Sequence, residues 1–170
     1  LDTGLTNGTM YYYGAFAYDE VPNYSSPGAQ VSGIPHDPQS PYPGPNPLAL
    51  PATIQVENFD NGGEGIAYHD TTTGNSGGQY RSTDVDIEGC SDTGGGYDVA
   101  YTEAGEWLEY KVSVASAGDY SLGVRVALNT GTGGYRVKVD GVDLTGARTY
   151  AATGGWQNWT TIITPSVHLN

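Results

Sequence analysis

The stretch TGGGYDVAYTEAGEWLEY, residues 93–110, predicts two short strands, each preceded by a glycine-containing turn. Its end alternates in polarity, and successive side chains of a strand point to opposite faces. Leu108 and Tyr110 are therefore expected to face a hydrophobic core, with Trp107 and Glu109 on the opposite face. A large aromatic ring beside a carboxylate on an outer face indicates a place where a ligand docks.

The sequence around this stretch predicts more strands of the same kind. Residues 84–88, 111–114, 120–128, 134–140, 142–144 and 159–163 read as strands separated by Gly, Asn and Asp turns, and residues 54–59 also alternate in polarity. No segment shows a convincing helical period. Many short strands with turn signals between them predict an all-β chain folded as a β-sandwich.

The composition narrows the classes of partner. The chain has 170 residues and a net charge of −13 with six basic residues, which argues against nucleic acid and against an anionic membrane surface as partners. No apolar run is long enough to cross a membrane. Cys90 is the only cysteine, so no internal disulfide can form. The chain starts at Leu1 and is read as part of a longer protein.

Proline placement suggests three parts: residues 1–33, 34–51 and 52–170. Seven of the ten prolines fall within 34–51, which predicts an extended, polyproline-like linker. In the first part, Leu5 stands six residues before Tyr11 across an Asn-Gly turn. This spacing resembles the tyrosine corner of a fibronectin type III domain. The resemblance implies that 1–33 is the C-terminal part of such a domain; a Tyr-rich strand pair packed on the next domain is the alternative.

The third part carries several sequence blocks in a fixed order. Ile54-Gln-Val-Glu-Asn, the block 94–110, Ala117-Gly-Asp-Tyr and Ala152-Thr-Gly-Gly-Trp-Gln-Asn-Trp-Thr-Thr together resemble a family 6 carbohydrate-binding module over residues 53–170. The resemblance implies a β-jelly roll that is not catalytic and that binds a polysaccharide or oligosaccharide. It also implies a secreted, extracellular protein of bacterial origin with a glycoside hydrolase catalytic domain in the same parent chain. Family members continue through about two more strands, so the module is expected to be truncated at its C-terminus.

The resemblance also assigns binding residues. It implies that Tyr101 and Trp156 hold a sugar between their rings and that Glu88 is the carboxylate of this cleft. The chemistry agrees, because aromatic rings stack on the CH faces of sugars while carboxylates and amides bond their hydroxyl groups. The family's second site, on the concave face of one sheet, would correspond to Trp107 and Glu109.

A structural calcium ion is the cofactor that the resemblance implies. Its side-chain ligands would be Gln55 and Glu57, with the carbonyl of Tyr97 as a third. Calcium takes six to eight oxygen ligands, so these groups alone do not establish a site.

Two other function classes remain open from the residues. A small glycoside hydrolase needs two carboxylates about 5–10 Å apart, one with a raised pKa. Glu103, Glu106 and Glu109 are close in sequence, but nothing in the sequence indicates that they are buried. His36, His69 and His168 are scattered and form no catalytic or zinc-binding pattern. A structural spacer or adhesion domain is the other class.

Overall fold

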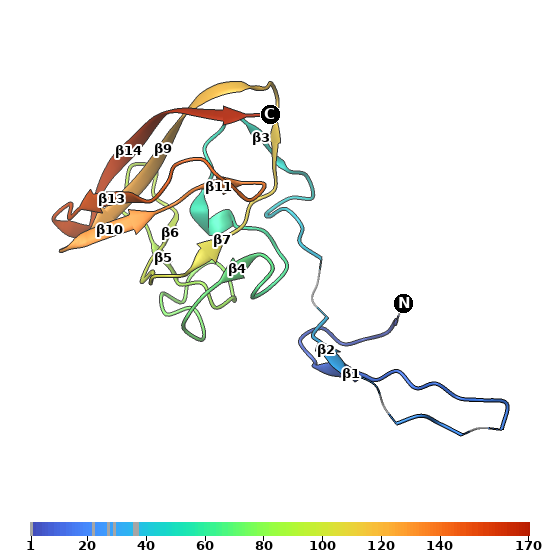
Figure 1. The fold of residues 1–170 in the computed structure, drawn as a ribbon. Coiled ribbons are helices and arrows are strands. Elements are labelled where there is room, and N and C mark those ends of the chain that lie inside the picture. The colour runs from blue at the N-terminus through green and yellow to red at the C-terminus, as the bar shows by residue number, and fades with distance from the viewer. Residues whose placement is uncertain (1, 22, 27, 29, 36–37) are drawn as a thin grey trace.

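The computed structural model describes residues 2–21, 23–26, 28, 30–35 and 38–170, so His36 lies outside the described residues (Figure 1). Almost all regular structure is β. The only helical element of the described residues is one short 3-10 helix, η1 (Val56–Asn58), near the centre of the larger body. The predicted all-β class is confirmed.

The larger body is made of strand pairs arranged on two sides of η1. Five pairs are antiparallel: β4–β7, β5–β6, β9–β14, β10–β13 and β11–β12; β3 and β8 pair in parallel. The long β9–β14 ribbon and the β10–β13 pair lie on one side, and the β4–β7 and β5–β6 pairs lie on the other (Figure 1). This arrangement is consistent with a β-sandwich. The strands are β3 (Leu48–Leu50), β4 (Tyr68–His69), β5 (Ile87–Gly89), β6 (Tyr97–Val99), β7 (Trp107–Leu108), β8 (Val112–Val114), β9 (Gly118–Leu128), β10 (Thr132–Tyr135), β11 (Lys138–Val139), β12 (Val142–Asp143), β13 (Arg148–Ala151) and β14 (Gly155–Leu169).

Three predicted segments differ from the structure. The alternating segment 54–59 contains η1 (Val56–Asn58) instead of a strand, because the Asn58 amide donates to the Gln55 carbonyl at 2.9 Å and closes a turn. The predicted strand 134–140 is divided between β10 and β11. The predicted strand 159–163 is the middle of the much longer β14, whose pairing with β9 is interrupted by two register shifts. Alternation of polar and apolar residues does not indicate where a hydrogen bond closes a turn, nor how far two strands stay paired.

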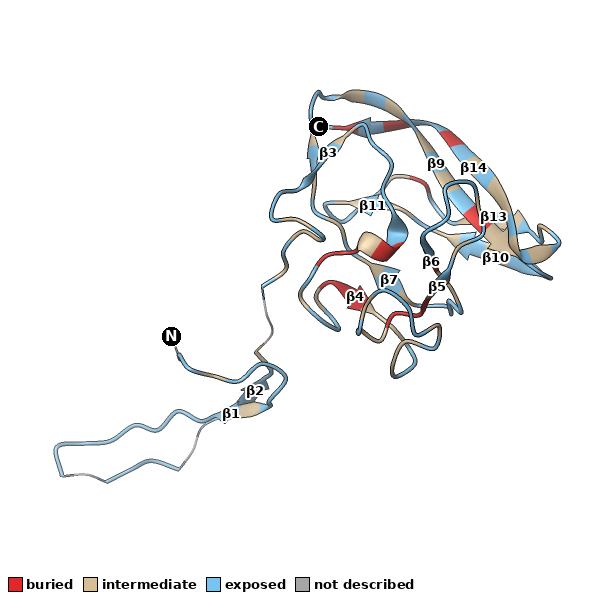
Figure 2. Ribbon diagram, turned by 180° about the vertical axis from the view of Figure 1, so that it is seen from behind, coloured by how far each residue is buried: buried red, intermediate tan, exposed pale blue. Residues whose placement is uncertain are grey.

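The core lies where η1 meets β4 and β5. Its fully or almost fully buried members are Phe59, Ala67, Tyr68, Val85 and Ile87. Figure 2 shows the buried residues in red around these elements. The Phe59 and Tyr68 rings meet edge to face, with centroids 5.4 Å apart.

The alternation predicted for residues 107–110 is confirmed. Leu108 and Tyr110 pack against the core, whereas Trp107 and Glu109 are exposed. The hydroxyl of Tyr110 donates to the Val56 carbonyl at 2.7 Å, which ties the end of this stretch to η1.

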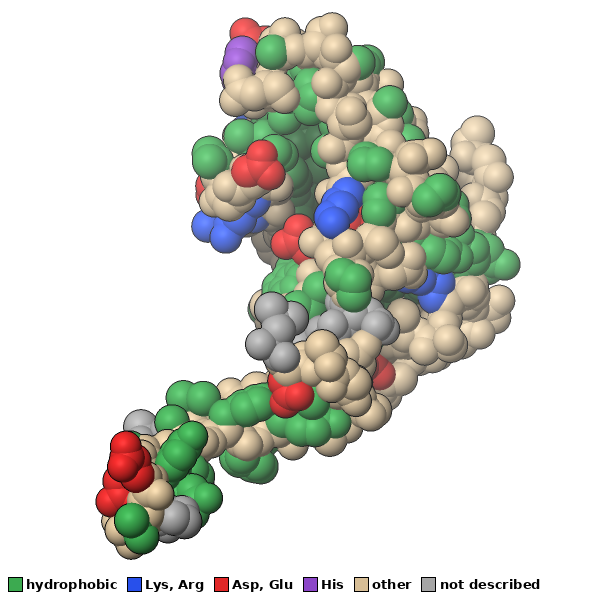
Figure 3. Space-filling view, turned by 90° about the vertical axis from the view of Figure 1, so that its right-hand side faces the viewer, with side chains coloured by type: hydrophobic (Ala, Val, Ile, Leu, Met, Phe, Trp, Pro, Cys, Tyr) green, Lys and Arg blue, Asp and Glu red, His purple; other side chains and the backbone are tan. Residues whose placement is uncertain are grey.

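The N-terminal part forms an antiparallel hairpin of β1 (Tyr11–Tyr13) and β2 (Val31–Gly33). The Thr6 amide donates to the Tyr11 hydroxyl at 3.0 Å, a contact that suits a tyrosine corner. The hairpin lies apart from the larger body, and its hydrophobic side chains are exposed along its length (Figures 1 and 3). The structure therefore does not show the alternative, a Tyr-rich strand pair packed on the next domain. The fibronectin origin of this part stays a prediction.

The second half of the Pro-rich segment does not form the free spacer that its prolines predict. The backbones of Ser40 and Asn61 exchange hydrogen bonds of 3.0 and 2.8 Å. Gln39 donates its side-chain amide to Asp60 at 2.9 Å, and β3 pairs with β8. Prolines favour an extended backbone, but the residues between them keep backbone and side-chain hydrogen-bonding groups. These groups attach the segment to the module. The domain boundaries themselves stay predictions.

Candidate functional site

Two exposed aromatic residues were predicted to hold the sugar. Tyr101 is 61% exposed and Trp156 is 62% exposed. Tyr101 follows β6 with a left-handed backbone, φ +51°, and Trp156 is the second residue of β14, within its first register shift. Neither ring contacts another aromatic ring in the part of the chain that the structure describes. Both rings are therefore largely accessible to a ligand, and their joint role stays a prediction.

The predicted carboxylate Glu88 belongs to a polar cluster. Glu88 on β5 lies directly opposite Asp98 on β6, an arrangement that places two like charges side by side. The side-chain amide of Gln157 bridges them, donating to Glu88 at 2.9 Å and to Asp98 at 3.3 Å. Asp98 is almost fully buried, and burial together with the Glu88 charge raises the pKa of its carboxyl group. The bridging amide offsets part of the repulsion between the two acids.

Gln157 connects this cluster to a neighbouring loop. Its carbonyl oxygen accepts hydrogen bonds from the Ser91 amide at 2.8 Å and from the Trp159 indole at 3.2 Å. Side chains alternate along β14, so Trp156 points away from the face on which Gln157 meets Glu88. Sequence reasoning missed Gln157, although the block Gly155-Trp-Gln-Asn-Trp contains it. Its partners Glu88 and Ser91 are 69 and 66 residues away along the chain.

An open, polar hollow of about 820 Å³ lies beside the cluster. The loop after β5, the strand β9, the end of β13 with the loop that follows it, and the first half of β14 form its walls. Asp92 and Arg125 make a two-pronged ion pair across it, at 2.6 and 2.7 Å, and Arg125 lowers the pKa of Asp92 to about 2. Trp159 and Gln157 also line this hollow, whereas Tyr101, Trp156 and Glu88 do not. Polar walls of this kind suit a hydroxyl-rich ligand.

The predicted second site is carried by β7. Trp107 is 38% exposed and stands opposite His69 of β4, with ring centroids 6.3 Å apart. Glu109 is exposed on the same face. His69 is held by Glu64 at 2.5 Å. The indole is therefore accessible and laterally supported, as a stacking surface must be.

The predicted calcium ligands lie at η1. Glu57 is buried at 7% exposure, and burial raises the pKa of its carboxyl group, with a further contribution from Asp98. Gln55 is exposed at the start of η1, and Tyr97 lies on β6, which packs against η1. Among the described residues, no three His, Cys, Asp or Glu side chains are grouped closely enough to hold a metal ion. The donors present fit such an ion only if amide and backbone oxygens complete the set.

The acids proposed for a hydrolase have structural partners. Glu106 accepts hydrogen bonds from the Glu103 amide at 2.8 Å and from the Thr71 amide and hydroxyl at 3.1 and 2.8 Å. These bonds fix the turn before β7. Glu109 projects into solvent, so the three acids do not form a pair in a shared cavity.

Comparison with known proteins bears on the family of the chain. A family model described as carbohydrate binding module (family 35) matches residues 81–169, just over half of the chain. The chain is also 36% identical over 85 residues to the clotting factor G alpha subunit of Tachypleus tridentatus, an alignment that covers 49% of this chain and 13% of that protein. The described residues include no helix long and apolar enough to cross a membrane. The prediction of a carbohydrate-binding module is confirmed, although the matching model does not support family 6 specifically: the chain belongs to carbohydrate-binding module family 35.

Proposed function

We propose that this chain is a non-catalytic module that holds a secreted polysaccharide-degrading enzyme on its β-glycan substrate, of the xylan, β-glucan or agarose type. The observation that carries the proposal is the exposure of Tyr101 and Trp156 on a module of a carbohydrate-binding family. Large rings are costly to leave in water, whereas a sugar CH face covers them well. The Glu88–Gln157 cluster and the polar hollow provide hydrogen-bonding groups near the start of β14.

Affinity electrophoresis in gels that contain xylan, mixed-linkage β-glucan or agarose tests this function. Retardation in one of these gels, with no release of reducing ends from the same polymer, is the expected result. Migration that no polymer changes would favour a spacer, and release of reducing ends would favour a hydrolase. In either case the proposed function would fail.

Substitution of the two exposed rings is expected to weaken this binding. Tyr101→Ala or Trp156→Ala removes a stacking surface worth about 1–3 kcal/mol, so polymer affinity should fall roughly tenfold or more. Both rings are exposed, so the melting temperature should change little. Tyr12→Ala, at an exposed ring of the N-terminal hairpin, is the matched control and should bind like the original chain. Unchanged affinity in both module variants would contradict the assignment.

Calcium is proposed as a structural ion at Gln55, Glu57 and the Tyr97 carbonyl. An ion that binds only the folded state raises stability by mass action, so added calcium should raise the melting temperature relative to chelator. Glu57→Gln should abolish this response, because it removes the one buried charge of the proposed set. In chelator the same variant should melt no lower than the original chain, because it relieves a buried charge near Asp98. Identical melting curves in calcium and chelator would exclude the site.

A further inference from the structure

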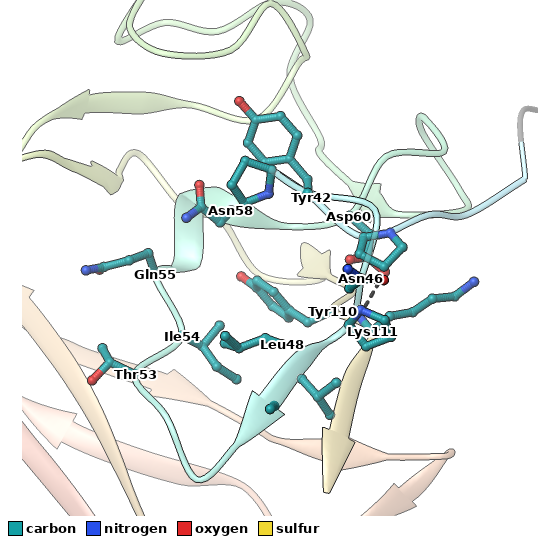
Figure 4. Close-up of a pocket in the computed structure, with 16 residues that line it drawn as sticks. Tyr42, Asn46, Leu48, Thr53, Ile54, Gln55, Asn58, Asp60, Tyr110 and Lys111 are labelled. Atoms are coloured by element: carbon teal, nitrogen blue, oxygen red, sulfur yellow. Dashed lines mark hydrogen bonds between the residues drawn. The ribbon is translucent and has the colours of Figure 1, made fainter. Parts of the chain in front are cut away.

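A cavity of about 270 Å³ lies between the second half of the Pro-rich segment and the module (Figure 4). The segment contributes Tyr42, Asn46 and Leu48 to its walls, and the module contributes Asn58 and Tyr110. None of the residues assigned above to sugar stacking lines it. Its volume is slightly below the usual range of ligand pockets, about 300–1,000 Å³, which suits one sugar ring rather than a longer chain.

The walls of the cavity are largely apolar. Figure 4 shows Tyr42 on one side and the side chains of Leu48, Ile54 and Tyr110 on the other, and three prolines also line the cavity: Pro41, Pro43 and Pro47. The Tyr42 ring is held in place, because the guanidinium carbon of Arg81 lies 4.0 Å from its centroid. Flat, fixed apolar surfaces are what the CH face of a sugar ring packs against.

The charges at the cavity are already satisfied. The Lys111 ammonium donates to the Gln39 carbonyl at 2.7 Å. The Asp60 carboxylate accepts from the Gln39 side-chain amide and from the Lys111 backbone amide, both at 2.9 Å. A charged ligand would have to displace these bonds, so the cavity favours a neutral one.

The uncharged polar groups at the cavity remain available. Within the described residues, the side-chain amide of Asn46 has no hydrogen-bond partner. Asn58 accepts from the Tyr80 hydroxyl at 2.7 Å through its oxygen, and its amide nitrogen donates to no described group. Amide groups both donate and accept, as hydroxyl groups do. The cavity therefore combines apolar walls with partners for hydroxyl groups.

We propose that this cavity is a second carbohydrate site, which takes a single neutral pyranose residue. It goes beyond the function proposed above, because it does not use Tyr101, Trp156 or Glu88. The Pro-rich segment supplies part of the site, so that segment is a component of the binding surface.

A titration followed by ¹H–¹⁵N NMR tests the proposal on the 170-residue chain, with D-xylose, D-glucose and D-galactose as probes in the millimolar range. At least one sugar should shift the side-chain amide signals of Asn46 and Asn58 in a saturable way. The double variant Asn46→Ala/Asn58→Ala loses two hydrogen bonds, and its affinity should fall about tenfold. Asn129→Ala, at an exposed asparagine outside the cavity, is the control and should titrate like the original chain.

Two further variants separate this site from the first. Ala49→Leu adds bulk at a residue that lines the cavity and should remove the saturable shifts, with its fold checked by the rest of the spectrum. Tyr101→Ala/Trp156→Ala should leave the titration unchanged while polymer retention is lost. The proposal is overturned if no probe shifts these amides, or if the Asn46→Ala/Asn58→Ala variant binds like the original chain. Retention on polysaccharide gels would survive such a failure, so the two proposals fail separately.

Discussion

Replacing Arg81 by alanine is expected to lower the free energy of unfolding by about 3 kcal/mol, because the side chain makes several partly buried contacts at once. Its guanidinium carbon lies 4.0 Å from the Tyr42 ring centroid and 3.9 Å from that of Phe59. It also donates to the Phe59 carbonyl and, at 3.2 Å, to the Asn61 side chain. The substitution leaves a core carbonyl without this donor and removes the contact between Tyr42 of the Pro-rich segment and the core.

Denaturant-induced unfolding measures this effect, and the chain provides a matched control. Arg125 also makes a short, two-pronged ion pair, but that side chain is about half exposed. Exposed pairs contribute about 0–1 kcal/mol, so Arg125→Ala should cost much less than Arg81→Ala. Arg81→Lys should recover only part of the loss, because an ammonium lacks the planar fork that stacks on two rings. Equal losses at Arg81 and Arg125 would show that Arg81 does not anchor the core.

Replacing Gly77 by alanine is expected to cost about 3 kcal/mol or more, because no space exists for a methyl group at this position. A Cβ atom on Gly77 would stand 2.1 Å from the carbonyl oxygen of Ile87 and 2.5 Å from its carbonyl carbon. Those atoms belong to β5, and Ile87 is fully buried. Rigid backbone of the core strand would have to move, and the hydrogen bond that the Gln79 amide donates to the same carbonyl at 3.2 Å would be disturbed.

Gly89→Ala is the control for this prediction. Gly89 is also on β5, but its added Cβ would meet nothing within 4 Å, and its backbone does not require glycine. Its unfolding free energy should stay within about 0.5 kcal/mol of the original value, as at most surface positions. A Gly77→Ala variant with a similarly small change would mean that the loop at 75–79 can move away from β5 at little cost.

The candidate surfaces were predictable only in part. The exposure of Tyr101 and Trp156 agrees with their places beside glycine-containing turns in the sequence, and their role in sugar binding stays a prediction. The engagement of Glu88 by Gln157 could not be predicted in this way, because these residues are 69 positions apart. The hollow beside Asp92 and Arg125 could not be predicted for the same reason, since these two charged residues are 33 positions apart in the sequence.

The sequence by itself determined the β class and the faces of residues 107–110, because alternation depends only on neighbouring residues of one strand. Leu108 and Tyr110 accordingly lie at the core, with Trp107 and Glu109 outside. Only the tertiary structure decided that 56–58 form a 3-10 turn and that β3 pairs with β8. It alone also brought Tyr42 onto Arg81 and left a cavity beside them. Those features arise from contacts between segments that are distant in the sequence. The free energy of such contacts depends on which surfaces meet, and a local sequence pattern does not specify those surfaces.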